Sequence, residues 1–126
     1  MSYHYDDQNI FAKILRGEIP NSTVLETAHS LAFNDINPLA PVHVLVIPRG
    51  PYVCYDHFAL EASDEEILDF TRAVGQVCRM LGVQADDAGD GCRLIANAGA
   101  NGVQEVPHLH VHVLGGRMLG RMLARA

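Results

Sequence analysis

Three histidines alternate with apolar residues in the stretch VPHLHVHVLGGR, which covers residues 106–117. Residues two positions apart on a strand share a face, so His108, His110 and His112 are expected to point the same way. The Cα atoms of neighbouring histidines would then lie about 6.6 Å apart, and those of His108 and His112 about 13 Å apart. Imidazole has a pKa of about 6.5 and can act as base, acid or nucleophile. A row of this length therefore fits a phosphate flanked by a leaving group.

The residues alone leave two other interpretations of the triplet open. The histidines could form a polar strand face in contact with water, or an H-x-H pair could share a metal ion. All three reach one ion only if the strand is strained. The preceding loop favours the phosphate, because Gly99 and Gly102 allow backbone N–H groups to turn towards an anion. The same two glycines are also typical of an ordinary turn.

Two further polar residues lie beside apolar strands elsewhere in the chain. His43 in APVHVLVIP could simply be a partly buried strand residue, and Asp35 in FNDINP could bond to its own backbone in a turn. Asp35 also has a chemical interpretation. A carboxylate suits a sugar diol, because its two oxygens can accept hydrogen bonds from two hydroxyl groups.

Hydrophobic spacing and capping signals predict the elements that carry these residues. Apolar residues at i, i+4 spacing predict a short helix that ends at Gly17. A longer helix is expected over 63–82, with a capping box at Ser63 and Glu66 and a stop at Gly82. Strands are expected at 22–27, 30–35, 42–48 and 92–98 and through the triplet, with a turn-rich stretch at 84–91. This order predicts an α+β protein with two helices and a mainly antiparallel sheet.

Composition excludes several classes of protein. A chain of 126 residues, 48% hydrophobic and 19% charged, fits one globular domain over 1–126, with tails at about 1–8 and about 115–126. Its apolar runs are far shorter than the roughly 20 residues of a membrane span, and no secretory signal is visible, so we expect a cytoplasmic protein and no membrane partner. A net charge of −6 argues against a nucleic-acid polymer as partner, although single nucleotides remain possible. The three cysteines lack the spacing of metal ligands, so we expect no bound metal and no disulfide framework.

Taken together, these segments resemble the histidine-triad (HIT) superfamily, in particular its nucleotide-binding branch of bacterial type. HLHVHVL at 108–114 matches the hallmark His-φ-His-φ-His-φ-φ, where φ is apolar, at every position. Similar stretches follow in the family's order: IFAKILRGEIP, LAFNDINPLAPVHVLVIPR, CRLIANAGANGVQEVPHLHVHVLGGR and GGRMLGRML. The resemblance implies a HIT-like fold, a homodimer whose two sheets join into one, and no cofactor.

The resemblance also implies hydrolysis of P–N bonds in purine nucleoside phosphoramidates, in which AMP is joined to an amine, and of acyl-AMP. His110 matches the nucleophile that forms a nucleotidyl-histidine, and His112 matches the residue that contacts the phosphate and the leaving group. His108 and His43 match supporting histidines, and Asp35 matches the carboxylate that binds the ribose hydroxyls. The other implied nucleotide-binding residues are Phe33 and Ile36 at the base, Asn97 and Gln104 near the ribose and phosphate, and Glu105 on the loop.

Some residues depart from the family pattern, and other hypotheses compete. Val103 stands where the family often has glycine, and Glu105 where many eukaryotic members have serine. Ala12 stands where some bacterial relatives have a zinc-binding cysteine. The alternatives are a dinucleoside polyphosphate hydrolase of the same superfamily, a nucleotide-binding regulatory module with negligible turnover, and a metalloprotein. The chain length, the GGR after the triplet and the IFAKI segment favour the phosphoramidase.

Overall fold

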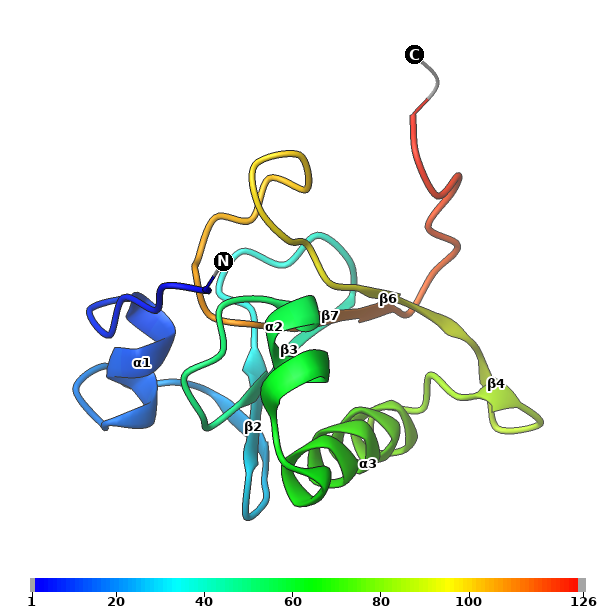
Figure 1. The fold of residues 1–126 in the computed structure, drawn as a ribbon. Coiled ribbons are helices and arrows are strands. Elements are labelled where there is room, and N and C mark those ends of the chain that lie inside the picture. Colours follow the sequence, from blue (N-terminus) through cyan, green and yellow to red (C-terminus); the bar gives the residue numbers. More distant parts are fainter. Residues whose placement is uncertain (1, 125–126) are drawn as a thin grey trace.

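Five antiparallel strands form the main sheet, in the order β1-β2-β3-β7-β6 (Figure 1). The computed structural model describes residues 2–124, so the first and the last two positions of the expected tails lie outside the described residues. The main strands are β1 (Thr23–Glu26), β2 (Ser30–Asn34), β3 (Val42–Pro48), β6 (Cys92–Ile95) and β7 (Val111–Gly115). The helices are α1 (Ile10–Leu15), α2 (Tyr55–Glu61) and α3 (Asp64–Met80). The α+β class and the antiparallel sheet are confirmed.

The long helix α3 begins and ends where its capping signals predict. The Ser63 hydroxyl accepts from the backbone N–H of Glu66, and the Glu66 carboxylate accepts from the backbone N–H of Ser63, both at 3.1 Å. After the C-cap Leu81, Gly82 takes a φ of +69°, a left-handed conformation that glycine adopts without strain. The predicted capping box is therefore confirmed.

The two faces of the sheet carry separate apolar clusters. Figure 1 shows α1 and α3 as separate helices beside the sheet. Val44, Val46 and Val113 pack against α3, whereas Leu45 and Ile47 belong to the cluster that includes Phe11 of α1. This alternation follows from the two-residue period of a strand. The face that α1 covers only in part is where the polar residues of β3 and β7 gather.

One helix and one hairpin were not expected. The stretch 51–62 contains α2, so the described residues hold three helices where the sequence predicts two. Helix α2 has only seven residues, and its N-cap Cys54 makes no side-chain capping bond, so it carries little local signal. Its Phe58 is 2% exposed, which indicates that packing holds it in place. The turn-rich stretch contains a short hairpin of β4 (Ala85–Asp86) and β5 (Gly89–Asp90).

Two broader expectations concern membranes and thiols. Among residues 2–124, no helix combines the length and the apolar character needed to cross a membrane. The three cysteines are free, as the sequence predicts.

The histidine triplet enters the sheet later than expected, because β7 begins only at Val111. Backbone groups before that point bond elsewhere: the N–H of Leu109 donates to the carbonyl of Tyr52, and the carbonyl of His108 accepts from the His110 ring. The alternation of side chains is nevertheless confirmed, since Leu109 and Val111 are buried in the cluster under α3.

Candidate active site

The three histidines lie on the face of the sheet towards α1 and are largely buried. His108 is 0% and His110 7% exposed, and His112 is half-buried. The ring of Phe11 on α1 meets the ring of His110 edge-on, with 5.0 Å between centroids. The rings of His110 and His112 are also 5.0 Å apart. The interpretation of the triplet as a water-exposed polar face is therefore wrong.

The hydrogen bonds of His110 determine which ring nitrogen is free. Its Nδ1 lies 2.7 Å from the carbonyl oxygen of His108, which can only accept, so Nδ1 carries the proton and donates. Burial lowers the pKa of His110, because the charged ring loses its hydration. At neutral pH the ring is therefore neutral, and Nε2 carries a lone pair. A neutral imidazole held through its other nitrogen can act as a nucleophile.

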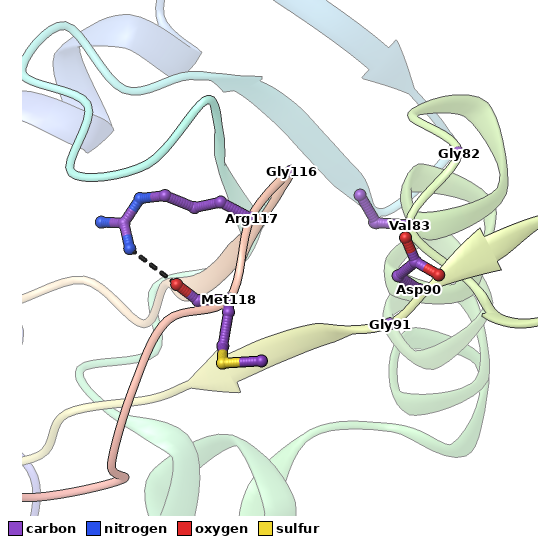
Figure 2. Close-up of a pocket in the computed structure, with 7 residues that line it drawn as sticks. All are labelled: Gly82, Val83, Asp90, Gly91, Gly116, Arg117 and Met118. Carbon is purple, nitrogen blue, oxygen red and sulfur yellow. Dashed lines mark hydrogen bonds between the residues drawn. The ribbon is translucent and has the colours of Figure 1, made fainter.

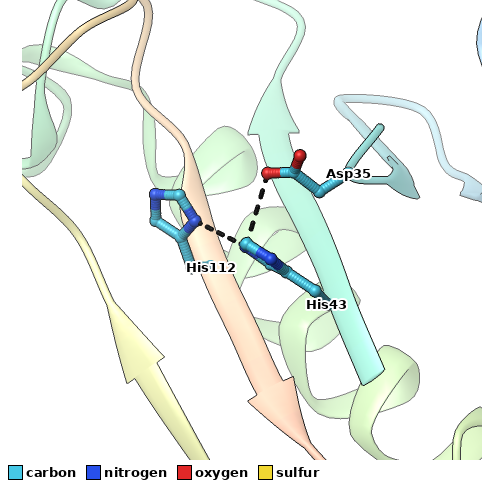
Figure 3. A group of neighbouring side chains, drawn as sticks. All are labelled: Asp35, His43 and His112. Atoms are coloured by element: carbon cyan, nitrogen blue, oxygen red, sulfur yellow. Dashed lines mark hydrogen bonds and ion pairs between the residues drawn. The ribbon is translucent and has the colours of Figure 1, made fainter. Parts of the chain in front are cut away.

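A second set of hydrogen bonds places the proton of His112 at its Nε2 (Figure 3). The backbone N–H of Leu39 donates to Nδ1 of His43 at 3.0 Å, which leaves the His43 proton on Nε2. That Nε2–H lies 2.9 Å from Nδ1 of His112 and 3.4 Å from Oδ2 of Asp35. His112 therefore accepts at Nδ1 and carries its own proton on Nε2. Burial, with smaller contributions from His110 and His43, lowers the pKa of His112 to about 4.

Strand register explains why His43 and His112 meet. In the β3–β7 pair, Leu45 lies opposite His112 and His43 lies opposite Leu114. His43 is therefore two residues from the position opposite His112 and on the same face, where diagonal neighbours are within reach of long side chains. Two residues 69 positions apart in sequence become hydrogen-bonding partners in this way.

Two cavities meet at His110 and His112. One, of about 340 Å³, is mainly apolar and runs along α1 and the end of β2. The other, of about 400 Å³, extends towards the loop before the triplet. Asp35, Glu105 and the two histidines line both. A molecule that spans the two cavities would therefore place its centre at the two imidazoles.

The structure brings most of the expected site residues to these cavities. Phe33 is buried in the wall of the apolar cavity, and Ile36 lies at its rim, 88% exposed. Asn97 lines the second cavity, as does Val103, whose φ of +55° is unusual for a residue other than glycine. This strain agrees with the family's preference for glycine there.

Gln104 differs from its expected position near the ribose and phosphate. Its Nε2 donates to the carbonyls of Val53 at 2.6 Å and Val106 at 3.0 Å, and its carbonyl oxygen accepts from the N–H of Gly99. Its side-chain amide is therefore bonded to backbone groups, and Gln104 is not among the described lining residues of either cavity. Gln104 therefore holds the glycine loop in shape.

Two residues near the site were missed from the sequence. Phe11 lines the apolar cavity. The apolar pattern of 9–18 indicates that Phe11 lies on α1, but it does not indicate that this helix borders the site. Tyr5, in the expected N-terminal tail, has its hydroxyl 2.6 Å from Nδ1 of His108. Nothing in the sequence around Tyr5 indicated this contact, because it joins positions 103 residues apart.

Asp35, His43 and His112 could together hold a metal ion, since one potential ligand atom from each lies within 4.8 Å of the others (Figure 3). The hydrogen bonds argue against this use. His43 faces the trio with Nε2, which is protonated because Leu39 occupies Nδ1. A cation would have to displace that proton and break the hydrogen bond between His43 and His112.

We therefore expect the purified protein to contain no stoichiometric zinc, as the sequence predicts. Elemental analysis by inductively coupled plasma mass spectrometry, before and after chelator treatment, measures this directly. One zinc per chain that survives the chelator would contradict the interpretation of the trio as a hydrogen-bonded relay.

A further cavity of about 390 Å³ lies beyond the end of β7 (Figure 2). It contains the carboxylate of Asp90, while Arg117 points away from that group and donates to the carbonyls of Met118 and Leu39. No histidine is among its described lining residues. This cavity therefore adds no further histidine to those at the triplet.

An antiparallel sheet with three alternating histidines, two of which line a cavity, is typical of the class of histidine-triad proteins. The chain belongs to the HIT family, because the family model of the HIT domain matches residues 16–119. It is 53% identical over 125 residues to an uncharacterised 13.2 kDa HIT-like protein of Azospirillum brasilense, with 99% of each chain covered. It is 38% identical over 121 residues to the purine nucleoside phosphoramidase of Escherichia coli K12, covering 94% of this chain and 95% of that one.

A solved structure supports the same assignment. The HIT family hydrolase Cth-393 from Clostridium thermocellum superposes with a TM-score of 0.80 at 36% identity, covering 93% of this chain and 98% of that one. The fold and the sequence therefore agree that this chain is a HIT family protein.

Proposed function

We propose that the chain is a purine nucleoside phosphoramidase that works through a nucleotidyl group on His110. One observation carries the proposal: a lone pair on Nε2 of His110 and a donor on Nε2 of His112 lie together where the two cavities meet. A nucleophile next to a proton donor is what cleavage of a P–N bond needs. The E. coli relative, named as a phosphoramidase, supports the same choice.

The proposed reaction has two steps. Nε2 of His110 attacks phosphorus, the P–N bond breaks with its electron pair on nitrogen, and that nitrogen takes the proton of His112 and leaves as the amine. Water then attacks the nucleotidyl group, gives a proton to His112 and releases the nucleoside monophosphate. His112 is neutral before the first step, so it becomes negatively charged when it gives up its Nε2 proton. The positive charge that His110 gains by attacking phosphorus favours this proton loss, because the two ring centroids are 5.0 Å apart.

The two cavities are proposed to divide the substrate between them. The apolar cavity, with Phe11, Phe33 and Ile36 in its wall, would hold the purine. The ribose would reach Asp35, which lines both cavities. The amine would lie in the second cavity, beside Asn97 and Glu105.

A comparison of substrates tests this function against its rivals. We expect adenosine 5′-phosphoramidate and AMP joined to a simple amine to be hydrolysed much faster than diadenosine triphosphate. Faster cleavage of diadenosine triphosphate would favour a dinucleoside polyphosphate hydrolase. AMP binding with no hydrolysis of either substrate would favour a regulatory module.

Asp35 is expected to favour ribonucleotides over deoxyribonucleotides. Its Oδ1 accepts from the N–H of Asn37 at 2.8 Å, so the bond to its own turn is present, yet a carboxylate still has acceptor sites for a diol. A charge-assisted hydrogen bond contributes about 1.5–3 kcal/mol. AMP should therefore bind about ten- to a hundredfold more weakly to Asp35→Asn, and 2′-deoxy-AMP similarly more weakly to the wild type.

Isothermal titration calorimetry with AMP and 2′-deoxy-AMP measures both effects. Asparagine can still accept from Asn37, so the turn is kept in the variant. Equal affinity for the two nucleotides would mean that Asp35 is only a turn residue.

We also propose that the chain forms a homodimer whose sheet continues through β6. β6 is one of the two edge strands of the sheet, and an apolar hollow of about 460 Å³ lies between it and α3. Leu94 on β6 lines this hollow and is 51% exposed. A second copy paired along β6 would cover the apolar residues and close the open edge.

The oligomeric state is therefore expected to be a dimer in sedimentation velocity, with twice the 13.7 kDa of one chain. Leu94→Glu places a charge in the proposed interface and should shift the protein towards the monomer. A wild-type mass of one chain at every concentration would contradict the proposal.

A further inference from the structure

The ring of His108 is held from both ends. It is completely buried, and its Nε2 lies 2.8 Å from the carbonyl oxygen of Pro48. That carbonyl can only accept, so Nε2 carries the proton and Nδ1 has the lone pair. The hydroxyl of Tyr5 lies 2.6 Å from Nδ1 and therefore donates to it. Without this donor, a buried acceptor would lose its hydrogen-bond partner, which is costly.

The backbone of His108 connects this arrangement to the nucleophile. Its carbonyl oxygen accepts the Nδ1–H of His110 at 2.7 Å, the bond that leaves Nε2 of His110 with its lone pair. Any rotation of residue 108 therefore changes the orientation of the His110 ring. Tyr5 acts two steps away, through His108, and does not line either cavity among the residues described there.

The segment that carries Tyr5 is attached on both sides of it. The ring of Tyr3 stacks on His57 at 4.3 Å with planes 8° apart, and its hydroxyl donates to Asp56 at 2.5 Å. On the other side, Arg16 donates to the carbonyl of Asp7 at 2.8 Å. These contacts deliver Tyr5 to His108, where its ring lies edge-on at 5.5 Å. Partial burial raises the pKa of Tyr5, so the phenol keeps its proton at neutral pH.

We propose that Tyr5 is a positioning residue of the active site: its hydroxyl holds His108, and His108 in turn orients the nucleophile His110. Within the N-terminal segment, this role belongs to the Tyr5 hydroxyl alone. The inference rests on the proposed function of His110. It predicts that loss of the hydroxyl slows the covalent step and leaves nucleotide binding unchanged, because Tyr5 is not among the described lining residues of the two cavities proposed to hold the nucleotide.

The test compares Tyr5→Phe with the matched control Tyr3→Phe. Each variant loses one hydroxyl and one hydrogen bond from the same segment and keeps the ring, but only Tyr5 contacts His108. For Tyr5→Phe we expect kcat on AMP joined to a simple amine to fall about tenfold or more, with an unchanged dissociation constant for AMP. Tyr3→Phe should keep the wild-type kcat, because its ring can still stack on His57 and Arg16 still holds Asp7, so Tyr5 stays at His108. An unchanged kcat in Tyr5→Phe, or an equal loss in both variants, would overturn the proposal.

A spectroscopic measurement separates this inference from the proposed function. In ¹⁵N-labelled wild-type protein, the side-chain NMR signals of His108 should show a protonated Nε2 and an unprotonated, hydrogen-bonded Nδ1. Tyr5→Phe should shift the Nδ1 signal of His108, whereas Tyr3→Phe should not. A protonated Nδ1 in the wild type would overturn the role of Tyr5 without any variant. If the NMR result holds but no phosphoramidate is hydrolysed, the contact stands and the proposed function fails.

Discussion

His110→Ala is expected to abolish turnover of AMP phosphoramidates while AMP still binds. The substitution removes the only atom that we propose to bond covalently to phosphorus. Loss of a covalent nucleophile lowers kcat by roughly 10³- to 10⁶-fold in enzymes of comparable design. Binding should survive, since the apolar cavity and Asp35 provide most of the contacts to base and ribose. Steady-state kinetics and calorimetry with AMP measure the two effects separately.

A second histidine variant controls for general damage. His29 lies at the surface, with its Nε2 3.3 Å from Glu65, and His29→Ala should keep the wild-type rate. His108→Ala should be milder than His110→Ala, because it removes a support and not the reactive atom. Substantial activity in His110→Ala would refute the assignment of the nucleophile.

His112→Ala is expected to show a loss of activity that depends on the leaving group. An amine leaves only after nitrogen has gained a proton, and positioned proton donors contribute about 10²- to 10⁴-fold. The variant should therefore lose about that factor on AMP joined to an alkylamine. The 4-nitrophenyl ester of AMP releases a stable anion without a proton, so its cleavage should fall far less.

The ratio of the two rates is the informative quantity. A misfolded or weakly binding variant would lose both activities together, whereas loss of the proton donor changes the ratio. His110→Ala serves as the control, because it should lose both. Equal losses on the two substrates in His112→Ala would show that His112 does not protonate the amine.

The sequence predicts those features that depend on neighbouring residues. The capping box of α3 is local to Ser63 and Glu66 and was recovered. The alternation around the triplet was also recovered, because Leu109 and Val111 face the core as a two-residue period requires. Helix α2 was missed, since its stability comes from burial of Phe58 by distant parts of the chain.

The polar network of the site could not be predicted in the same way. The contact of His43 with His112 depends on the register of β3 and β7. The contact of Tyr5 with His108 joins the N-terminal segment to the residues just before β7. The resemblance predicts Gln104 near the ribose and phosphate, but its amide donates to the carbonyls of Val53 and Val106. Sequence spacing indicates which residues belong to the site, but the contacts between their atoms depend on how distant parts of the chain pack together.

The most direct test of the account is the position of the covalent intermediate. Wild-type protein is mixed with labelled AMP phosphoramidate, quenched within the first turnover under conditions that preserve phosphoramidates, digested and analysed by mass spectrometry. The proposed mechanism predicts an adenylate on His110, attached through Nε2 because Nδ1 is bonded to the carbonyl of His108. An adenylate on His108 or His112, or hydrolysis with no adenylated histidine in the first turnover, would contradict it.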